Sequence, residues 1–364
     1  MGIKAGLVGL PNVGKSTLFN ALTKSSVPAE NYPFCTIDPH LAITEVPDVR
    51  LKQLAKVFGS QKLIPSTISF VDIAGLVKGA SQGEGLGNQF LTHIREVDLI
   101  LHVIRCFEAL DPVTPLDDFD TIILELILKD LDSIDKRKVK IGSLLKAAQN
   151  KPAEKKALEA EQILLEEIIV LLGNQDIESV QKKAAAAGLN TVDLFGAKKF
   201  LIAANLNEDD FVNENYKNNP HLQALITRFG ESRVIPVCAR TEYELTLLDE
   251  AEQVEMKEML GVTLSGLETI IKKSYDSLGL ITFFTVGPKE AHAWPIKKGI
   301  SVRKAAGEIH SDLERGFICA EVFNAKDIIA AGSEAALKTS GKIKTEGQDY
   351  VVQDGDLLNI RFNV

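Results

Sequence analysis

Eight residues near the start of the chain, Gly9-Leu-Pro-Asn-Val-Gly-Lys-Ser16, match the pattern GxxxxGK[ST] in full. An apolar run precedes them and a helical pattern follows, which is the context in which this pattern binds nucleotide phosphates. Glycines let backbone N–H groups surround phosphates, lysine adds a positive charge, and the serine hydroxyl suits Mg²⁺. We therefore predict a phosphate-binding loop. The nucleotide-binding residues expected in and beside it are Gly9, Asn12, Val13, Gly14, Lys15, Ser16 and Thr17.

Two later segments complete the expected phosphate site. Asp72 ends an apolar run about 55 residues after the loop, and Gly75 follows it. A carboxylate at a strand end can hold Mg²⁺ through water, and the Gly75 backbone can approach a γ-phosphate. Thr36 lies between the loop and Asp72 and is the candidate switch threonine for Mg²⁺, although an ordinary surface threonine is the alternative. The predicted metal ligands are therefore Ser16, Thr36 and Asp72.

The base site is expected where an apolar run ends at Asn205 and turns acidic. GTP-binding proteins carry Asn-Lys-x-Asp here, but this chain has Leu206 and Glu208 at the Lys and Asp positions. Glu208 is one methylene longer, so the paired contact with guanine does not fit. The Asn205 amide matches the adjacent donor and acceptor of adenine. Leu206 would add apolar or backbone contact, and Cys238 and Ala239 would close over the base. An acidic strand end without a ligand is the alternative.

The elements that must position these residues alternate between strands and helices. Strands are predicted at Lys4–Leu10, Thr67–Val71, Leu99–Val103, Phe200–Ala204 and Val234–Val237, and the loop is followed by a helix over Ser16–Thr23. This alternation is typical of an α/β fold with a parallel sheet between helices.

A long helical insert separates the strand at Leu99–Val103 from the strand at Phe200–Ala204. Apolar residues recur at helical spacing from Ile127 to Leu145, and again from Leu158 to Leu172, with a break at Asn150-Lys-Pro152. Two striped helices joined by a proline turn predict an antiparallel helical hairpin. A stripe that merely faces the core is the alternative. Its Lys- and Glu-rich surface is expected to be solvated, and the hairpin could act as a docking arm.

The last part of the chain has a different pattern. Leu280–Val286 predicts a strand, Val302–His310 a helix, and Gln348–Phe362 two strands around a turn at Asp354-Gly355. This indicates a small α+β domain. The predicted domains are a P-loop NTPase domain at 1–120 and 197–276, an inserted helical hairpin at 121–196, and a C-terminal domain at 278–362.

Composition limits the class of protein. The 364 residues are 45% hydrophobic and 25% charged, as in globular proteins, and the net charge of −9 argues against a coat held on nucleic acid by bulk positive charge. The four cysteines are scattered without a CxxC pair, which favours a reduced cytoplasmic location. No apolar run reaches the roughly 18 residues of a membrane span, and no signal peptide is visible. We expect no membrane contact and a monomer.

Several motifs together resemble a known family. Asp72–Asn88 with Phe90–Arg95 resembles the glycine-rich second switch of Obg-related GTPases. Taken with Gly9–Thr17, Arg105–Glu108 and Asn205–Glu208, the chain is similar to YchF-type Obg-like ATPases over nearly its whole length. Its C-terminal part resembles the TGS domain of that family, a β-grasp unit. The resemblance implies a preference for ATP over GTP and a ribosomal partner met through the TGS domain and the hairpin, with lysines of the TGS domain facing rRNA.

The route of hydrolysis is less defined. Leu76 stands where Ras-type proteins carry a water-orienting glutamine, and leucine cannot orient water by hydrogen bonding. The resemblance implies that Asn12 helps to hold K⁺, which would support K⁺-stimulated turnover, although Asn12 could simply shape the loop. The catalytic histidine proposed for this family lies in a longer loop than Cys106–Pro115, which has none. His93 and His102 are predicted to be structural, so no catalytic base is assigned, and only Lys15 and Asn12 are charge- or ion-positioning candidates.

Three functions remain in competition. The leading one is an Mg²⁺-dependent ATPase switch that acts with the ribosome in translation or stress regulation. The second is a nucleotide-controlled protein that binds and sequesters a protein partner. The third is a GTPase of conventional specificity. Ribosome co-sedimentation in different nucleotide states separates the first from the second, and a comparison of ATP with GTP binding tests the third.

Overall fold

The computed structural model describes residues 3–26, 40–73, 86–109, 111–189, 191–259 and 265–363. The chain divides into two compact units. We call Ile3–Ala21 with Val71–Gly261 the P-loop unit, and Leu22–Phe70 with Val262–Val364 the C-terminal unit. Each is described by itself.

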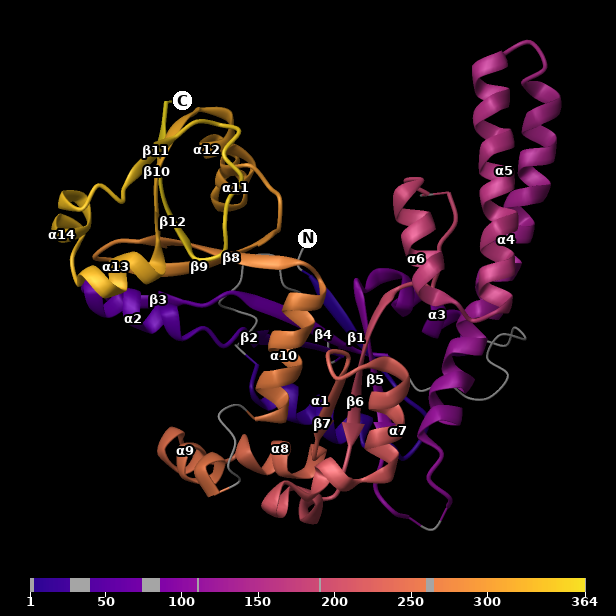
Figure 1. Ribbon diagram of the computed structural model, residues 1–364, viewed down its shortest axis with the longest axis horizontal. Helices are drawn as coiled ribbons and strands as arrows, with labels where there is room; N and C mark the ends of the chain where they lie inside the picture. The colour runs from indigo at the N-terminus through magenta and orange to yellow at the C-terminus, as the bar shows by residue number, and fades with distance from the viewer. Residues whose placement is uncertain are drawn as a thin grey trace. The chain divides into compact units, whose positions relative to one another are not determined.

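The P-loop unit is built on a parallel sheet. Strands β1 (Lys4–Val8), β5 (Leu99–Arg105), β6 (Lys199–Asn205) and β7 (Val234–Val237) lie side by side in that order (Figure 1). Strand β4 (Thr67–Asp72) ends in this unit, where the Ile73 N–H donates to the Leu7 carbonyl over 3.2 Å. The strands read as continuous apolar runs because their side chains are buried on both faces of the sheet.

Helices follow the strands of the P-loop unit along the chain. Their bounds are α1 Lys15–Lys24, α3 Leu86–Glu96, α7 Pro220–Phe229, α8 Ala239–Leu245 and α9 Glu250–Met259, with the 3₁₀ helix η3 at Glu208–Asn218. Strands β1, β4, β5, β6 and β7 confirm the predicted strands, and α1 confirms the helix predicted after the loop. The largest differences in the bounds of these strands are that β1 ends at Val8 and that β5 continues to Arg105.

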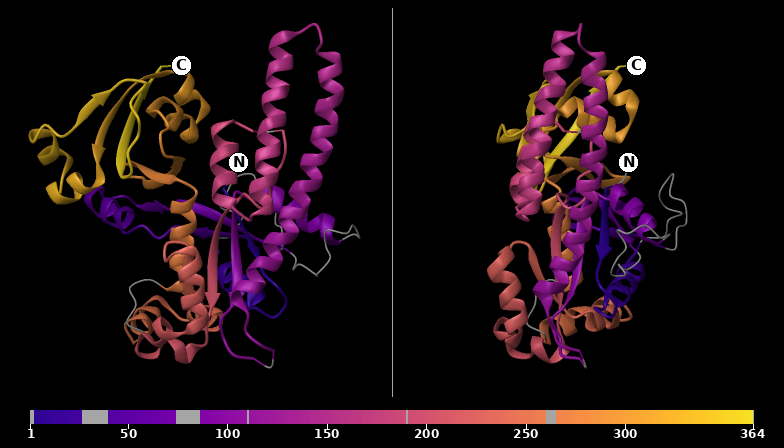
Figure 2. Two further views of the ribbon diagram at one scale, coloured as in Figure 1. Left: turned by 45° about the vertical axis from the view of Figure 1, so that its right-hand side comes forward. Right: turned by 90° about the vertical axis from the view of Figure 1, so that its right-hand side faces the viewer.

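The insert forms the predicted hairpin. Helices α4 (Pro115–Ala147) and α5 (Pro152–Gly173) run antiparallel, as both views in Figure 2 show, and a shorter helix α6 (Ile177–Ala186) follows. A proline opens each long helix, where its missing N–H costs no hydrogen bond. The predicted stripes face each other: Ile134, Ile141, Leu165 and Ile168 are fully buried.

The C-terminal unit contains a mixed six-stranded sheet of order β11-β10-β12-β8-β9-β3. It also contains β2 and most of β4, which are neighbours at the start of the strand order β2-β4-β1-β5-β6-β7. The strand bounds are β2 Leu41–Glu45, β3 Lys62–Ile64, β8 Leu280–Val286, β9 Glu290–Lys297, β10 Phe317–Asn324, β11 Lys344–Glu346 and β12 Asp356–Phe362. The helix bounds are α2 Val49–Phe58, α10 Gly266–Ser277, α11 Val302–Ile309, α12 Ser311–Arg315, α13 Ala325–Ala331 and α14 Glu334–Thr339. The predicted strand at β8 and helix at α11 are confirmed.

The predicted hairpin over Gln348–Phe362 is wrong. Strand β12 pairs with β10 and β8, whereas Val351 forms only an isolated bridge to Ser301. Side chains explain the difference, because Asp356 accepts from the Gln353 N–H and from the Tyr350 hydroxyl, which folds the preceding segment into a turn. Gly355, with φ of 87°, ends that turn, and its N–H donates to the Thr282 carbonyl.

The two compact units group residues differently from the predicted domains. Leu22–Phe70, expected in the NTPase domain, belongs with the C-terminal segment, where Leu51 and Leu54 of α2 pack in one apolar cluster with Phe284 and Leu357. Strand β3 pairs with β9 in the same unit. The domain boundaries stay a prediction. Among the described residues, no helix has the length and apolar character needed to cross a membrane.

Candidate nucleotide-binding site

The loop between β1 and α1 has the conformation that its glycines permit. Gly14 has φ of 92° and Asn12 has φ of 63°, both in the left-handed region. Gly9 lies against β5, where an added Cβ would come within 2.8 Å of the Val103 carbonyl oxygen. The Leu18 N–H donates to the Gly14 carbonyl over 3.0 Å, so α1 begins directly at the loop and leaves its first N–H groups for phosphate.

The charged end of the site joins residues far apart in sequence. Lys15 Nζ forms a direct ion pair with Asp72 Oδ1 at the end of β4, and both side chains are largely buried. The structure therefore brings the predicted phosphate lysine and the predicted metal ligand together. Ser16 is exposed at the start of α1 beside them. A hydroxyl and a carboxylate are the hard oxygen donors that Mg²⁺ prefers, so these residues fit this ion.

The other end of the site is fixed by Asn205, the last residue of β6. Its side chain is 5% exposed and bridges two loops: Nδ2 donates to the Val13 carbonyl over 2.9 Å, and Oδ1 accepts from the Ala239 N–H over 2.9 Å. A Cβ atom at Gly14 would overlap Asn205 Nδ2. Asn205 thus ties the phosphate loop to the loop after β7.

Asn205 retains hydrogen-bonding capacity in this arrangement. A carboxamide has two N–H donors and two carbonyl lone pairs, and among the described residues the protein uses one of each. One donor and one acceptor remain, which is the complement of the N7 acceptor and N6 donor of adenine. The same side chain can therefore position both loops and contact a base.

The other predicted base residues lie near Asn205 in differing environments. Leu206 is 2% exposed and packs in the main apolar cluster, while its N–H donates to the Val237 carbonyl over 2.8 Å. Cys238 and Ala239 are buried at the start of α8. Glu208 is exposed in the first turn of η3. Leu206 in this arrangement contributes to the core, so a contact with base through its side chain stays a prediction.

Part of the predicted site lies outside the described residues. This applies to Thr36, Gly75 and Leu76. Val13 is 3% exposed, and Thr17 lies within α1. Among the residues that the structure describes, no group of three His, Cys, Asp or Glu side chains could hold a metal ion.

The histidines have the structural character expected of them. His102 on β5 is fully buried against the rings of Phe119 and Phe200, and burial lowers its pKa to about 3. A histidine of this kind is neutral and is not a base within reach of a ligand. His93 lies on α3, and its Nδ1 is buried without a hydrogen-bond partner among the residues that the structure describes.

Asn219 is a positioning residue that the sequence reasoning missed. Its Oδ1 accepts from the N–H groups of His221 and Leu222 at the start of α7, and its Nδ2 donates to the Cys106 carbonyl over 3.3 Å. The Cys106 N–H in turn donates to the Asn205 carbonyl. The signal was present, because an asparagine before a proline at the first helical position is a common helix start.

Comparison with known proteins agrees with this geometry. A family model described as 50S ribosome-binding GTPase matches residues 4–142, and the YchF-GTPase_C model, described as a protein of unknown function, matches residues 280–363. "Ribosome-binding ATPase YchF" of Haemophilus influenzae is 46% identical over 374 residues, and that of Bacillus subtilis 43% over 371, each with 100% of both chains covered.

A solved structure extends the likeness to three dimensions. The chain is similar to the one titled "Structure of the Schizosaccharomyces pombe YchF GTPase", with a TM-score of 0.85 and 34% identity over 99% of this chain and 98% of that one. The predicted α/β P-loop fold with a C-terminal domain is thereby confirmed. Full-length identity to several relatives and similarity to this solved structure show that the chain belongs to the YchF family.

Proposed function

We propose that this chain is an ATPase that prefers ATP over GTP and acts as a switch on the ribosome. The observation that carries the nucleotide choice is the remaining donor and acceptor on Asn205, directly beside the phosphate loop. The relatives are named ribosome-binding ATPases, which supports both parts of the proposal.

Base selection rests on what each purine would present to Asn205. Guanine carries an acceptor, O6, where adenine carries its N6 donor, so the free lone pair of Oδ1 would face another oxygen. The Ala239 N–H is not available to O6, because it already donates to Asn205 Oδ1. Glu208 stands where guanine binders use aspartate and is exposed in η3. All three features favour adenine.

At the phosphate end, Lys15 would exchange its carboxylate partner for the phosphates. Ser16, Asp72 and Thr36 would hold Mg²⁺, which would neutralise the charge of the phosphates. The exchange leaves Asp72 free of the lysine when nucleotide is bound. Because positioning and charge stabilisation carry most of phosphoryl transfer, this arrangement needs no general base from the protein.

K⁺ stimulation is a finer part of the proposal. Asn12 is exposed on the phosphate-binding loop, where its φ is 63°. Its amide oxygen suits a monovalent cation. Turnover is expected to be faster in K⁺ than in Na⁺ buffer, and Asn12→Ala is expected to remove the difference. Equal rates in the two buffers with the wild-type protein would contradict this assignment.

Titration of ATP and GTP against the purified full chain with Mg²⁺ tests the nucleotide choice. We expect tighter binding of ATP and a measurable rate of ATP hydrolysis. Lys15→Ala is the control for the site, and it should lower turnover by at least about 100-fold, because it removes a charge that stabilises the transferring phosphate. Clear preference for GTP would overturn the proposal.

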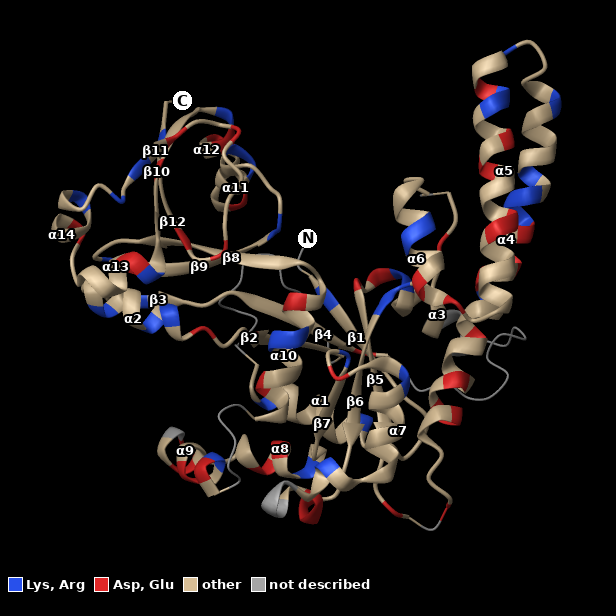
Figure 3. Ribbon diagram, in the orientation of Figure 1, with Lys and Arg blue, Asp and Glu red and all other residues tan. Residues whose placement is uncertain are grey.

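The hairpin supplies a surface for the ribosomal partner. Between residues 138 and 160, at the outer end, there are six lysines and two glutamates, whereas residues 115–137 of α4 carry seven acidic and three basic residues. Figure 3 shows this contrast along the two helices. Lys140, Lys146 and Lys156 are exposed and make no ion pair within the described part of the chain. This end suits the phosphate backbone of rRNA.

Co-sedimentation with ribosomes tests this surface. Replacing Lys140, Lys146 and Lys156 by glutamate should weaken binding and flatten its dependence on salt, since fewer counterions are released. The matched control replaces Glu154 and Glu159 of the same end by glutamine, which should leave binding equal or stronger. Unchanged ribosome binding of the lysine variant would show that the contact lies elsewhere. Ribosome binding that does not depend on the nucleotide state would favour a sequestering protein.

The remaining parts of the proposal concern organisation. The NTPase domain at 1–120 and 197–276, the hairpin at 121–196 and a TGS domain at 278–362 would act as one monomer, with lysines of the TGS domain as a second rRNA contact. A cytoplasmic location is included, and free Cys106, Cys238 and Cys319 agree with reducing surroundings. Sedimentation of the pure protein checks the monomer.

A further inference from the structure

Six residues between α6 and β6 join three elements of the P-loop unit. We call Asp193-Leu-Phe-Gly-Ala-Lys198 the connector. It runs from the end of the hairpin insert to the first residue of β6, Lys199. Its own backbone is folded by a hydrogen bond from the Lys198 N–H to the Phe195 carbonyl, and the Lys198 carbonyl accepts from Gln181 Nε2 of α6.

On the hairpin side, the connector is held by one buried carboxylate. Asp130 of α4 is fully buried, and its two oxygens accept from the N–H groups of Phe195 over 2.6 Å and Gly196 over 2.9 Å. There is no free space at this contact. A Cβ atom at Gly196 would come within 3.1 Å of Asp130 Oδ2 and 3.3 Å of Ile127. The connector is thus bonded directly to the hairpin helix.

On the opposite side, the connector holds the end of α3. Lys198 Nζ donates to the carbonyls of Arg95 over 2.9 Å and Val97 over 2.5 Å. The Arg95 guanidinium pairs with Asp193 over 2.8 Å and lies over the Phe195 ring. Burial lowers the pKa of Lys198, because desolvation disfavours the charged amine. The two hydrogen bonds to carbonyls are therefore formed at a cost in desolvation of that amine. Helix α3 follows Asp72 along the chain.

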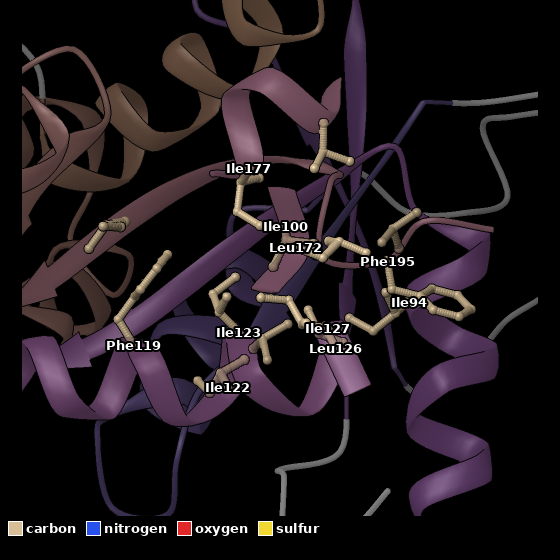
Figure 4. Packing of buried hydrophobic residues seen from close by; sticks show 14 of the residues in the cluster. Ile94, Ile100, Phe119, Ile122, Ile123, Leu126, Ile127, Leu172, Ile177 and Phe195 are labelled. Carbon is tan, nitrogen blue, oxygen red and sulfur yellow. The ribbon is translucent and has the colours of Figure 1, made fainter. Parts of the chain in front are cut away.

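Apolar packing completes the joint. The Phe195 side chain is 1% exposed and belongs to the cluster that contains Ile94 of α3 and Ile127 of α4. Figure 4 shows these labelled side chains gathered between the two helices. A close-packed joint of this kind shifts as a unit, because a displaced side chain leaves no room for its neighbours to stay in place.

The connector also leads to the base end of the nucleotide site. It continues into β6, which is hydrogen-bonded on both sides to β5 and β7 and ends at Asn205. Asn205 in turn holds Val13 of the phosphate loop and Ala239. A continuous series of bonded groups, buried at Asp130, Phe195 and Asn205 but exposed at Lys199, therefore runs from the hairpin to the loops of the site.

We propose that the connector couples the position of the hairpin to the nucleotide site, with Lys198 and Asp130 as its positioning residues. This inference rests on the proposed function. It gives the hairpin a way to sense and to alter the nucleotide state of the site. A merely structural connector would stabilise the fold and transmit nothing. The two roles differ in whether nucleotide binding changes the hairpin through Lys198.

Hydrogen exchange of the full chain, read by mass spectrometry with and without a non-hydrolysable ATP analogue and Mg²⁺, separates them. In the wild type, analogue binding is expected to change exchange over residues 121–137 by about fivefold or more, in the range of ordinary couplings between sites. In Lys198→Met that response should be lost while affinity for the analogue stays within about threefold, because Lys198 does not touch the site.

Three further variants make the test specific. Lys198→Arg keeps a donor for the two carbonyls and should restore the response. Lys182→Met removes an exposed lysine from neighbouring α6 and should behave as the wild type. Asp130→Asn approaches the joint from the hairpin side and should also lose the response, which keeps the test valid if Lys198→Met fails to fold.

The outcomes distinguish the inference from the function beneath it. A wild-type chain that binds the analogue without a change over residues 121–137 overturns the inference alone, as does an unaltered response in both Lys198→Met and Asp130→Asn. A wild-type chain that does not bind the analogue overturns the proposed function and this inference with it.

Discussion

Asn205 and Asp130 hold two joints of the P-loop unit in similar ways but with different chemistry. Each side chain is buried and bonds to two backbone groups: Asn205 to Val13 and Ala239, Asp130 to Phe195 and Gly196. The amide of Asn205 meets one acceptor and one donor without charge. The carboxylate of Asp130 meets two donors, and burial raises its pKa to about 7.

This difference in chemistry indicates which of the two joints can respond to pH. A neutral amide has the same hydrogen bonds at any ordinary pH, so the base end of the site has a fixed geometry. A buried carboxylate is close to balance between its charged and protonated forms, because its two N–H donors favour the charge and desolvation opposes it. The joint to the hairpin is therefore the adjustable one.

The largest effect is expected from giving Asn205 the chemistry of Asp130. Asn205→Asp would place a carboxylate oxygen against the Val13 carbonyl and lower the free energy of unfolding by about 3 kcal/mol at pH 8. The loss should shrink at lower pH, because a protonated carboxyl can donate to that carbonyl. Urea unfolding at several pH values measures it, and a loss independent of pH would show that the charge is not the cause.

A smaller loss of stability is expected when the carboxylate at the other joint is removed. Asp130→Ala removes the acceptor of two buried N–H groups and should lower the free energy of unfolding by about 2 kcal/mol, near the cost of one to two unsatisfied donors. Part of this loss of stability is offset, because the variant no longer buries a charged carboxylate. Denaturant unfolding at pH 8 checks it, with Asp132→Ala on the exposed face of α4 as control. A stability equal to the control would mean that water replaces the carboxylate.

Titration of Asp130 gives the third effect. Its pKa is raised in the folded chain, mainly by burial and further by Asp193, so the folded state binds the proton more tightly and stability increases as pH falls through about 7. From pH 8 to 6 the wild type should gain about 1 kcal/mol relative to Asp130→Asn, which cannot titrate. Parallel pH profiles of the two proteins would show that Asp130 does not titrate between pH 6 and 8.

The smallest effect on stability is expected at Glu208, an exposed side chain next to the fixed base end. Glu208→Asp should change the free energy of unfolding by less than about 0.5 kcal/mol, as is usual at the surface. It should improve GTP binding and leave ATP binding unchanged, because it restores the carboxylate reach of guanine binders. Titration of both nucleotides measures this, and a parallel change for ATP would remove Glu208 from base selection.

Most of the fold could be predicted from sequence because its signals are local. The phosphate loop, the strand ends at Asp72 and Asn205, and the two apolar stripes of the hairpin each follow from a short pattern. The failure at Gln348–Phe362 arose because Asp354-Gly355 signals a turn but not the partner of the strand that follows. Strand β12 pairs with β8 and β10, whose residues are distant in sequence from it, so no local pattern identifies these partners.

The structure brings Lys15 to Asp72 and Val13 to Asn205, whereas the assignment of these residues to a nucleotide site stays a prediction. The sequence predicts Asn205 as a reader of the base but gives no sign of its bonds to Val13 and Ala239, since contacts across 192 and 34 positions of sequence leave no local signal. Lys198 and Asp130 were missed for the same reason. A lysine near an exposed segment and an aspartate on a helix ordinarily indicate solvated surface.

The chain passes between the two units more than once. This limits where it can be cut into fragments that fold. The C-terminal match begins at residue 280, yet β9 pairs with β3 at Lys62–Ile64, and Arg50 pairs with Asp354 over 2.7 Å. A fragment cut before β8 would leave the β9 edge and the Phe284 face uncovered, so it should aggregate. Expression of this half therefore requires residues 40–70, supplied in trans or joined by a circular permutation.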